Sequence, residues 1–174
     1  MSKQFYIKPV KEYLDTLKLI EKINNDIWVD SSTVIVCCSP EYSSILSQII
    51  NHKLSHRNNN VPFDMDFLEM PYPGQQLYSE EDYIEDLETF GRKYVNADRK
   101  LLFIDSGVLR GRNFNILDNV MEEYLKPKQR KFACLYKQDN SVFEPDYYVE
   151  EFSFDKQGGL TFWWENNDNP YWGW

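Results

Sequence analysis

The sequence has little positive charge, no long apolar run and few cysteine or histidine residues. Its 19 lysine and arginine residues face 28 aspartate and glutamate residues, giving a net charge of −9. We therefore expect neither nucleic acid nor an anionic membrane as a partner. No run of 18 apolar residues occurs, so no transmembrane helix is expected. The first residues, MSKQF, lack the apolar core of a secretion signal, which favours a cytoplasmic location.

The cysteines and histidines do not form a metal-binding pattern. Cys37, Cys38 and Cys134 lie in apolar runs, their number is odd, and no CxxC spacing occurs. These features predict buried free thiols rather than a disulfide framework or a zinc site. His52 and His56 have a spacing that can bind a metal, but no third ligand is near them in the sequence. We therefore expect no metal site in the protein itself.

The chain has enough apolar material for one globular domain. Hydrophobic residues make up 42% of its 174 positions and aromatic residues 16%. Apolar runs alternate with segments of helical spacing, which favours an α/β fold with a mainly parallel, twisted sheet flanked by helices. Strands are predicted at 33–38, 61–69, 100–105, 131–136 and 147–152. Helices are predicted at 11–24, from Pro40 after an N-cap at Ser39, from Ser79, and after Asn113.

The first predicted helix shows how these patterns are interpreted. Leu14, Leu17, Ile20 and Ile23 recur at helical spacing within 11–24. The spacing predicts that these four side chains form the buried face of the helix.

The stretch from Leu101 to Asn113 carries the most chemistry. Four apolar residues run into Asp105, and a short loop with two glycines and two arginines then leads into a helix. A strand that delivers backbone N–H groups and cations to a helix N-terminus is suited to hold a phosphate. In parallel sheets, ligands bind at this carboxyl end of the strands.

Three segments, in order, resemble the purine phosphoribosyltransferase family. In the first, Asp105 and Gly111 match the acidic and Thr-Gly-x-Thr positions of the loop that binds phosphoribosyl pyrophosphate. The second is Leu135-Tyr136-Lys137, at the end of the next strand. The third, 145–149 followed by 160–165, is similar to the tail of xanthine-guanine-type enzymes. The resemblance covers about residues 30–166 and implies one phosphoribosyltransferase-like domain. Its core spans about 30–140, and a small aromatic-rich hood spans about 141–174.

The resemblance also implies site roles. Asp105 is the implied catalytic residue and grips the ribose hydroxyls, Lys137 reaches the exocyclic oxygen of the purine, and Trp164 belongs to the segment that closes the base pocket. The other implied substrate-binding residues are Ser106, Arg110, Gly111, Arg112 and Asn113. An active enzyme of this kind would use Mg²⁺ with phosphoribosyl pyrophosphate.

Several of these positions depart from the family pattern. Ser106 replaces the second acidic residue, and Leu109 stands where a base-assisting Asp is expected and cannot accept a proton. Arg110 and Asn113 replace threonines. After the first core strand, the chain has Ser39-Pro40-Glu41-Tyr42-Ser43 instead of a glycine-rich pyrophosphate loop, and Pro40 lacks an N–H donor.

The departures leave three hypotheses open. In the first, the protein binds a nucleotide or a phosphoribosyl ligand, and its transferase activity is weak or lost. In the second, it is an active purine phosphoribosyltransferase in which Arg110 and Arg112 clamp the anion. In the third, it is a protein-interaction module that binds a partner, or a second copy of itself, through the Trp-rich end 169–174. The same residues can also be structural: Asp105 can cap a turn, the arginines can pair with carboxylates, and the tail can pack over the pocket.

Overall fold

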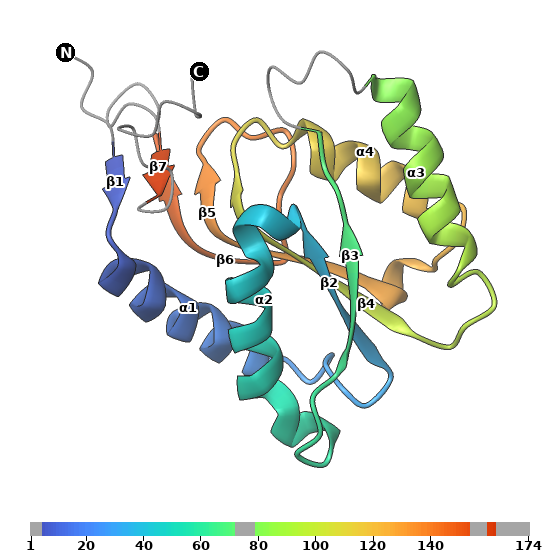
Figure 1. Cartoon of the computed structure of the whole chain (residues 1–174), viewed down its shortest axis with the longest axis horizontal. Helices are drawn as coiled ribbons and strands as arrows, with labels where there is room; N and C mark the ends of the chain where they lie inside the picture. The colour runs from blue at the N-terminus through green and yellow to red at the C-terminus, as the bar shows by residue number, and fades with distance from the viewer. Residues whose placement is uncertain (1–4, 72–78, 154–159, 163–174) are drawn as a thin grey trace.

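The computed structural model describes residues 5–71, 79–153 and 160–162 (Figure 1). Its centre is a five-stranded sheet in the order β3-β2-β4-β5-β6, with every neighbouring pair parallel. The strands are β2 (Thr33–Cys38), β3 (Asp64–Leu68), β4 (Lys100–Val108), β5 (Arg130–Gln138) and β6 (Tyr147–Phe152). Two short strands, β1 (Phe5–Ile7) and β7 (Leu160–Phe162), form a separate parallel pair.

Helices cover both faces of the sheet (Figure 1). Neighbouring residues of β2 point to opposite sides: Val34 and Val36 belong to one apolar core, and Ile35 belongs to the other. The first core includes residues of α3 (Glu80–Arg92) and α4 (Arg112–Met121), and the second includes residues of α1 (Pro9–Asn24) and α2 (Pro40–Leu54). Two 3₁₀ turns complete the described elements, η1 (Ser55–Asn58) and η2 (Pro127–Gln129). The predicted α/β fold with a parallel sheet is confirmed.

Several local predictions also hold. Ser79 caps α3 through a reciprocal capping box with Asp82. All three cysteines are free and buried. Among the described helices, none is long and apolar enough to span a bilayer.

The predicted buried face of α1 is right for Ile23 and Ile20, which pack in the core, but wrong for Leu14. Leu14 is 51% exposed, whereas Asp15 and Thr16 are buried beside Leu19 and Ile23. The helix is rotated because Asp15 has specific partners below it. Its carboxylate accepts hydrogen bonds from the Tyr136 hydroxyl at 2.8 Å and from two lysines of its own helix. A buried carboxylate with such partners is tolerated in place of a leucine.

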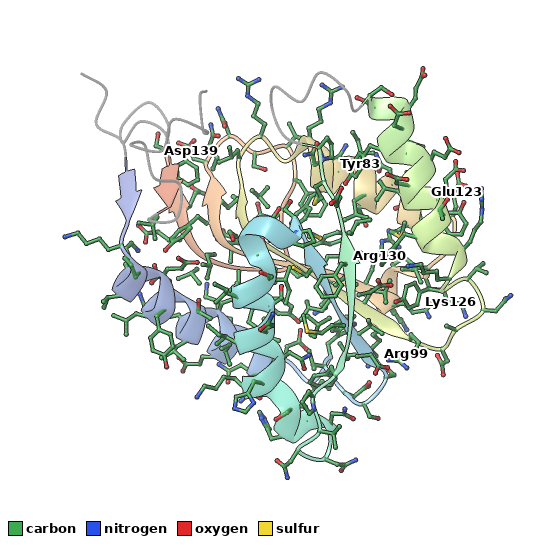
Figure 2. The ribbon with its side chains drawn as sticks, viewed as in Figure 1. Tyr83, Arg99, Glu123, Lys126, Arg130 and Asp139 are labelled. Carbon is green, nitrogen blue, oxygen red and sulfur yellow. The ribbon has the colours of Figure 1, made fainter. Side chains whose placement is uncertain are left out.

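A second charged cluster supports the edge of the sheet where the strands begin. Arg130, almost fully buried, donates to Asp118, to Glu122 and to the carbonyl of Leu125 (Figure 2). These contacts join the start of β5 to the end of α4 and the turn after it. The cluster lies at the edge opposite the carboxyl ends of the strands, so its role is structural.

Candidate functional site at the carboxyl end of β4

The strand order creates a switch point between β2 and β4. From β2 the chain moves outward to β3, then returns to the other side of β2 as β4 and continues through β5 to β6. The connections after β2 and after β4 therefore diverge at the carboxyl edge of the sheet. Ligands of open parallel sheets bind in the crevice formed there. Asp105 of β4 and the first turn of α2 lie on its two sides.

Three polar side chains bridge this crevice. The Ser43 hydroxyl, from α2, donates to Asp105 Oδ1 at 2.8 Å and accepts from the Ser106 N–H at 3.1 Å. The Ser106 N–H also donates to Asp105 Oδ1 at 2.6 Å, and the two serine hydroxyl oxygens are 3.3 Å apart. Ser43 and Ser106 are buried, while Asp105 is partly exposed. The Asp105 carboxylate is thus held by Ser43 and by the Ser106 N–H, and the residue keeps part of its surface exposed.

The electrostatics of Asp105 are unusual for an aspartate. Burial raises its pKa from an ordinary value near 3.8 to about 7, although hydrogen bonds from Ser43 and from the backbone N–H groups of Ser106 and Gly107 act in the opposite direction. In the described part of the chain, no lysine or arginine forms an ion pair with it. A carboxyl group that changes charge near neutral pH and lacks a cationic partner is typical of a functional site.

The loop after Asp105 is shorter than the sequence predicted. The strand does not end at 105: β4 continues to Val108, with Gly107 and Val108 in register with Tyr136 and Lys137 of β5. Because these residues are in the sheet, only residues 109–111 remain as a loop. The prediction failed because the period-two pattern of a strand is not visible in the Ser-Gly pair.

Gly111 begins α4 in a left-handed conformation, with φ 76°. A side chain is excluded there, because a Cβ atom would lie 2.3 Å from Ser141 Oγ and 2.7 Å from the Phe143 nitrogen. The neighbouring Val142 N–H donates to the Arg110 carbonyl at 3.0 Å. The 141–143 turn therefore packs directly against the loop, and this packing gives Gly111 a structural role whatever else it does.

The two arginines of the loop differ in their surroundings. Arg112 forms an ion pair with Glu80, at the start of α3. Arg110 is exposed, and none of the described acidic residues forms an ion pair with it. Both residues lie at the N-terminal end of α4, where the helix dipole adds to their positive charge. Leu109 is 47% exposed beside them.

Asn113 ties this edge to neighbouring elements. Its side-chain amide donates to the Pro71 carbonyl at 2.8 Å, and its own carbonyl accepts from the Tyr83 hydroxyl at 3.3 Å. Figure 2 shows Tyr83 directed from α3 toward α4. Asn113 thus positions the start of α4.

Lys137 lies at the end of β5 and is held in place by two carboxylates. Its ammonium group bonds to Glu144 and lies 3.1 Å from Glu151. It also sits over the ring of Tyr148, 4.9 Å from its centroid. The hydrogen bond that Lys137 donates to Glu144 raises the pKa of Lys137 above its usual range, and only 8% of the Lys137 side chain is exposed. In this arrangement the ammonium group already has two carboxylate partners within the protein.

We expect Lys137→Met to lower the free energy of unfolding by about 1–2 kcal/mol, because the ion pairs of Lys137 with Glu144 and Glu151 are lost. The loss is limited because both carboxylates are exposed enough to be hydrated by water. Chemical denaturation measures the change. Lys128→Met, an exposed lysine in η2, is the matched control. A Lys137→Met variant with full stability but weakened purine-nucleotide binding would instead support the base-contacting role that the resemblance implies.

Other predicted site residues fall in different places. Trp164 lies outside the described residues, as do the Trp-rich end and most of the predicted hood beyond residue 153.

Ser43 was not predicted. The available signal was weak: a small polar residue in the first turn of the helix that follows the first core strand. In the described ranges, no three metal-binding side chains come together.

Known structures share this fold. A purine phosphoribosyltransferase from Pyrococcus horikoshii Ot3 matches with a TM-score of 0.65 and 16% sequence identity, over 95% of each chain. The xanthine-guanine-hypoxanthine phosphoribosyltransferase of Helicobacter pylori matches with a TM-score of 0.59 and 13% identity, over 92% of each chain. No family model matches the sequence, and no curated protein matches it. The chain therefore has the phosphoribosyltransferase-like fold that the motifs predicted.

Proposed function

We propose that the protein binds the ribose 5-phosphate part of a purine nucleotide, or a related phosphoribosyl ligand, at the carboxyl end of β4. The observation that carries this proposal is the placement of Asp105. It lies at the switch point of the sheet, is held by Ser43 and Ser106, has no cationic partner among the described residues, and is partly exposed. A carboxylate presented in this way can accept hydrogen bonds from the hydroxyls of a ribose.

The phosphate would bind next to it. Arg110 is exposed and within the same short loop, and Arg112 is one residue into α4. The ion pair of Arg112 with Glu80 is solvent-exposed, so an incoming phosphate competes with it at little cost. Guanidinium groups at a helix N-terminus suit a phosphate because they combine bidentate hydrogen bonding with the helix dipole.

We further propose that transfer chemistry is weak or lost. The connection after β2 supports this view. The Ser39 N–H already donates to the Leu68 carbonyl at 2.9 Å, and Pro40 has no N–H, so neither residue can offer a backbone donor to a leaving pyrophosphate. The engaged ammonium of Lys137 and the Ser106 and Leu109 replacements point the same way. A single preorganised donor can be worth about 10²–10³ in rate, so several such losses together are severe.

Mg²⁺ fits the proposal only as an ion that binds together with a pyrophosphate-containing ligand. Mg²⁺ is commonly held by one or two carboxylates together with substrate phosphates, and Asp105 supplies one such carboxylate at the site. If phosphoribosyl pyrophosphate binds, Asp105 would hold its Mg²⁺, and the ion would neutralise charge on the pyrophosphate. Binding of a simple nucleoside monophosphate needs no metal.

The test is thermal stabilisation by guanosine 5′-monophosphate, ribose 5-phosphate and phosphoribosyl pyrophosphate with Mg²⁺. Ligand at about 100 times its Kd stabilises by roughly 2.7 kcal/mol. Arg110→Ala/Arg112→Ala is expected to lower the affinity for ribose 5-phosphate at least tenfold, because both phosphate-binding guanidinium groups are lost. Pyrophosphate release with purine bases, measured in the same samples, is expected to be absent or slow.

A matched control keeps this test specific. Arg92→Ala/Lys128→Ala also removes two exposed positive charges, but at the opposite edge of the sheet, and is expected to leave binding unchanged. Equal stabilisation of the wild type and of Arg110→Ala/Arg112→Ala would remove the arginines from the site. Turnover with a purine base would restore the active-enzyme hypothesis.

A further inference from the structure

Helix α1 exposes an apolar face that nothing in the described structure covers. Val10, Tyr13 and Leu14 are 69%, 48% and 51% exposed, at spacings that place them along one side of the helix. They are exposed because the rotation of α1 that buries Asp15 turns Leu14 outward. Clustered apolar side chains on a surface commonly mark a contact with another segment or molecule.

The same face carries a shallow hollow with a cationic rim. The hollow is lined by Lys8, Val10, Lys11, Leu14, Asp15 and Lys18. Asp15, which is buried, bonds to Lys11 and Lys18, and Lys11 also bonds to Glu150 of β6. Lys8 is exposed, and 62% of the Lys18 side chain is exposed. A fitting occupant therefore has aromatic or aliphatic groups together with a small number of acidic ones.

The direction of strand β7 points to this end of α1. Strand β7 pairs with β1 in parallel, and Phe162 is in register with Ile7. Lys8, the first residue of the hollow's lining, follows Ile7 directly. Because the two strands run the same way, β7 points toward the start of α1, and Figure 1 shows β1 and β7 side by side.

The segment 163–174, which we call the C-terminal segment, also matches the face in length and chemistry. Its twelve residues can span about 40 Å when extended, and α1, with 16 residues, is about 24 Å long. It contains four tryptophans and one tyrosine, two acidic residues (Glu165 and Asp168), and no lysine or arginine. Aromatic rings next to exposed lysines gain both apolar contact and cation–π attraction.

We propose that the C-terminal segment docks on the exposed face of α1, with its aromatic side chains on Val10, Tyr13 and Leu14 and its acidic residues beside the lysine rim. This contact is independent of the ligand site at β4. It assigns the Trp-rich end to an intramolecular contact rather than to a foreign partner.

Hydrogen–deuterium exchange of the full-length protein tests the proposal, read on peptides from residues 163–174. We expect exchange to be at least tenfold faster in Val10→Asp/Leu14→Asp than in the wild type, with both proteins monomeric by light scattering. Both substituted residues are exposed, so the fold should be kept, and protection of the β4 peptide verifies this. Ile27→Asp/Val61→Asp, which adds the same charge at other exposed apolar positions, should leave the exchange unchanged.

Two results would overturn the proposal. One is equally fast exchange of the C-terminal segment in the wild type and in Val10→Asp/Leu14→Asp. The other is protection that appears only at concentrations where the protein is dimeric, which would assign the α1 face to the segment of a second copy. Neither result bears on phosphate binding, which is measured separately at β4.

Discussion

Asp105→Asn is expected to make the protein more stable at pH 8 by about 2–4 kcal/mol, or several degrees in Tm. Burial raises the pKa of Asp105 to about 7, so the folded protein holds this proton more tightly than the unfolded chain does. Stability attributable to Asp105 is therefore present below about pH 4 and is lost as the pH rises to about 7. The asparagine does not ionise, so the difference in Tm between variant and wild type should grow from pH 4 to pH 7 and then level off.

The same substitution should weaken the binding of ribose-containing ligands. Asparagine keeps one acceptor oxygen for Ser43 but loses the negative charge that favours hydrogen bonds from ribose hydroxyls. We expect ribose 5-phosphate to lose at least tenfold in affinity and inorganic phosphate to lose little. Gain of stability with loss of binding is the pattern of a residue retained for function.

Asp139→Asn is the matched control for both measurements. Asp139 is exposed just after β5, at the same edge of the sheet (Figure 2). Its replacement removes the same charge, and we expect a change in stability within about 0.5 kcal/mol. If the Tm of Asp105→Asn followed that of the wild type at every pH, Asp105 would titrate as an ordinary surface aspartate and the electrostatic basis of the site would be wrong.

Gly111→Ala is expected to destabilise the protein by about 2–4 kcal/mol without any ligand present. The left-handed conformation at φ 76° is costly for alanine, and the new Cβ would lie within 3 Å of Ser141 and Phe143. Urea denaturation at pH 7 measures the effect, which is a large part of the stability of a typical domain.

A double variant separates packing from conformation. Ser141→Ala removes the oxygen that the new methyl group approaches most closely, so Gly111→Ala/Ser141→Ala should recover part of the loss. The Phe143 nitrogen, at 2.7 Å, remains, and full recovery is not expected. If Gly111→Ala were as stable as the wild type, the 141–143 turn would not pack on the loop as described.

The order of the elements could be predicted because it depends on local patterns. The alternation of β-branched runs with segments of helical spacing predicted the parallel sheet, and Ser79 with Asp82 predicted the start of α3. The motif that ends at Asn113 located the β4–α4 connection, and with it Asp105. These features are encoded by residues within one or two turns of each other, so no knowledge of distant contacts was needed.

Predictions failed where a distant partner decides the outcome. Leu14 was predicted to be buried, but Asp15 is buried in its place because it accepts a hydrogen bond from Tyr136, 121 positions away. Strand β4 continues past Ser106 because Gly107 and Val108 pair with Tyr136 and Lys137 of β5. Ser43 reaches Asp105 across 62 positions, and a lone serine in a helix gives no sign of this.

The sequence by itself determined that this is an acidic α/β domain, and it placed the candidate site after the central strand. Periodicity and composition are properties of neighbouring residues, and burial of apolar surface translates them directly into strands and helices. Only the tertiary structure decided the state of the side chains. It gave Asp105 a raised pKa and no cationic partner among the described residues, held Lys137 between two carboxylates, packed Gly111 against a turn, and left one face of α1 exposed. The reason is physical: desolvation, ion pairing and close packing depend on distances between residues far apart in the chain, and those distances exist only once the sheet has formed.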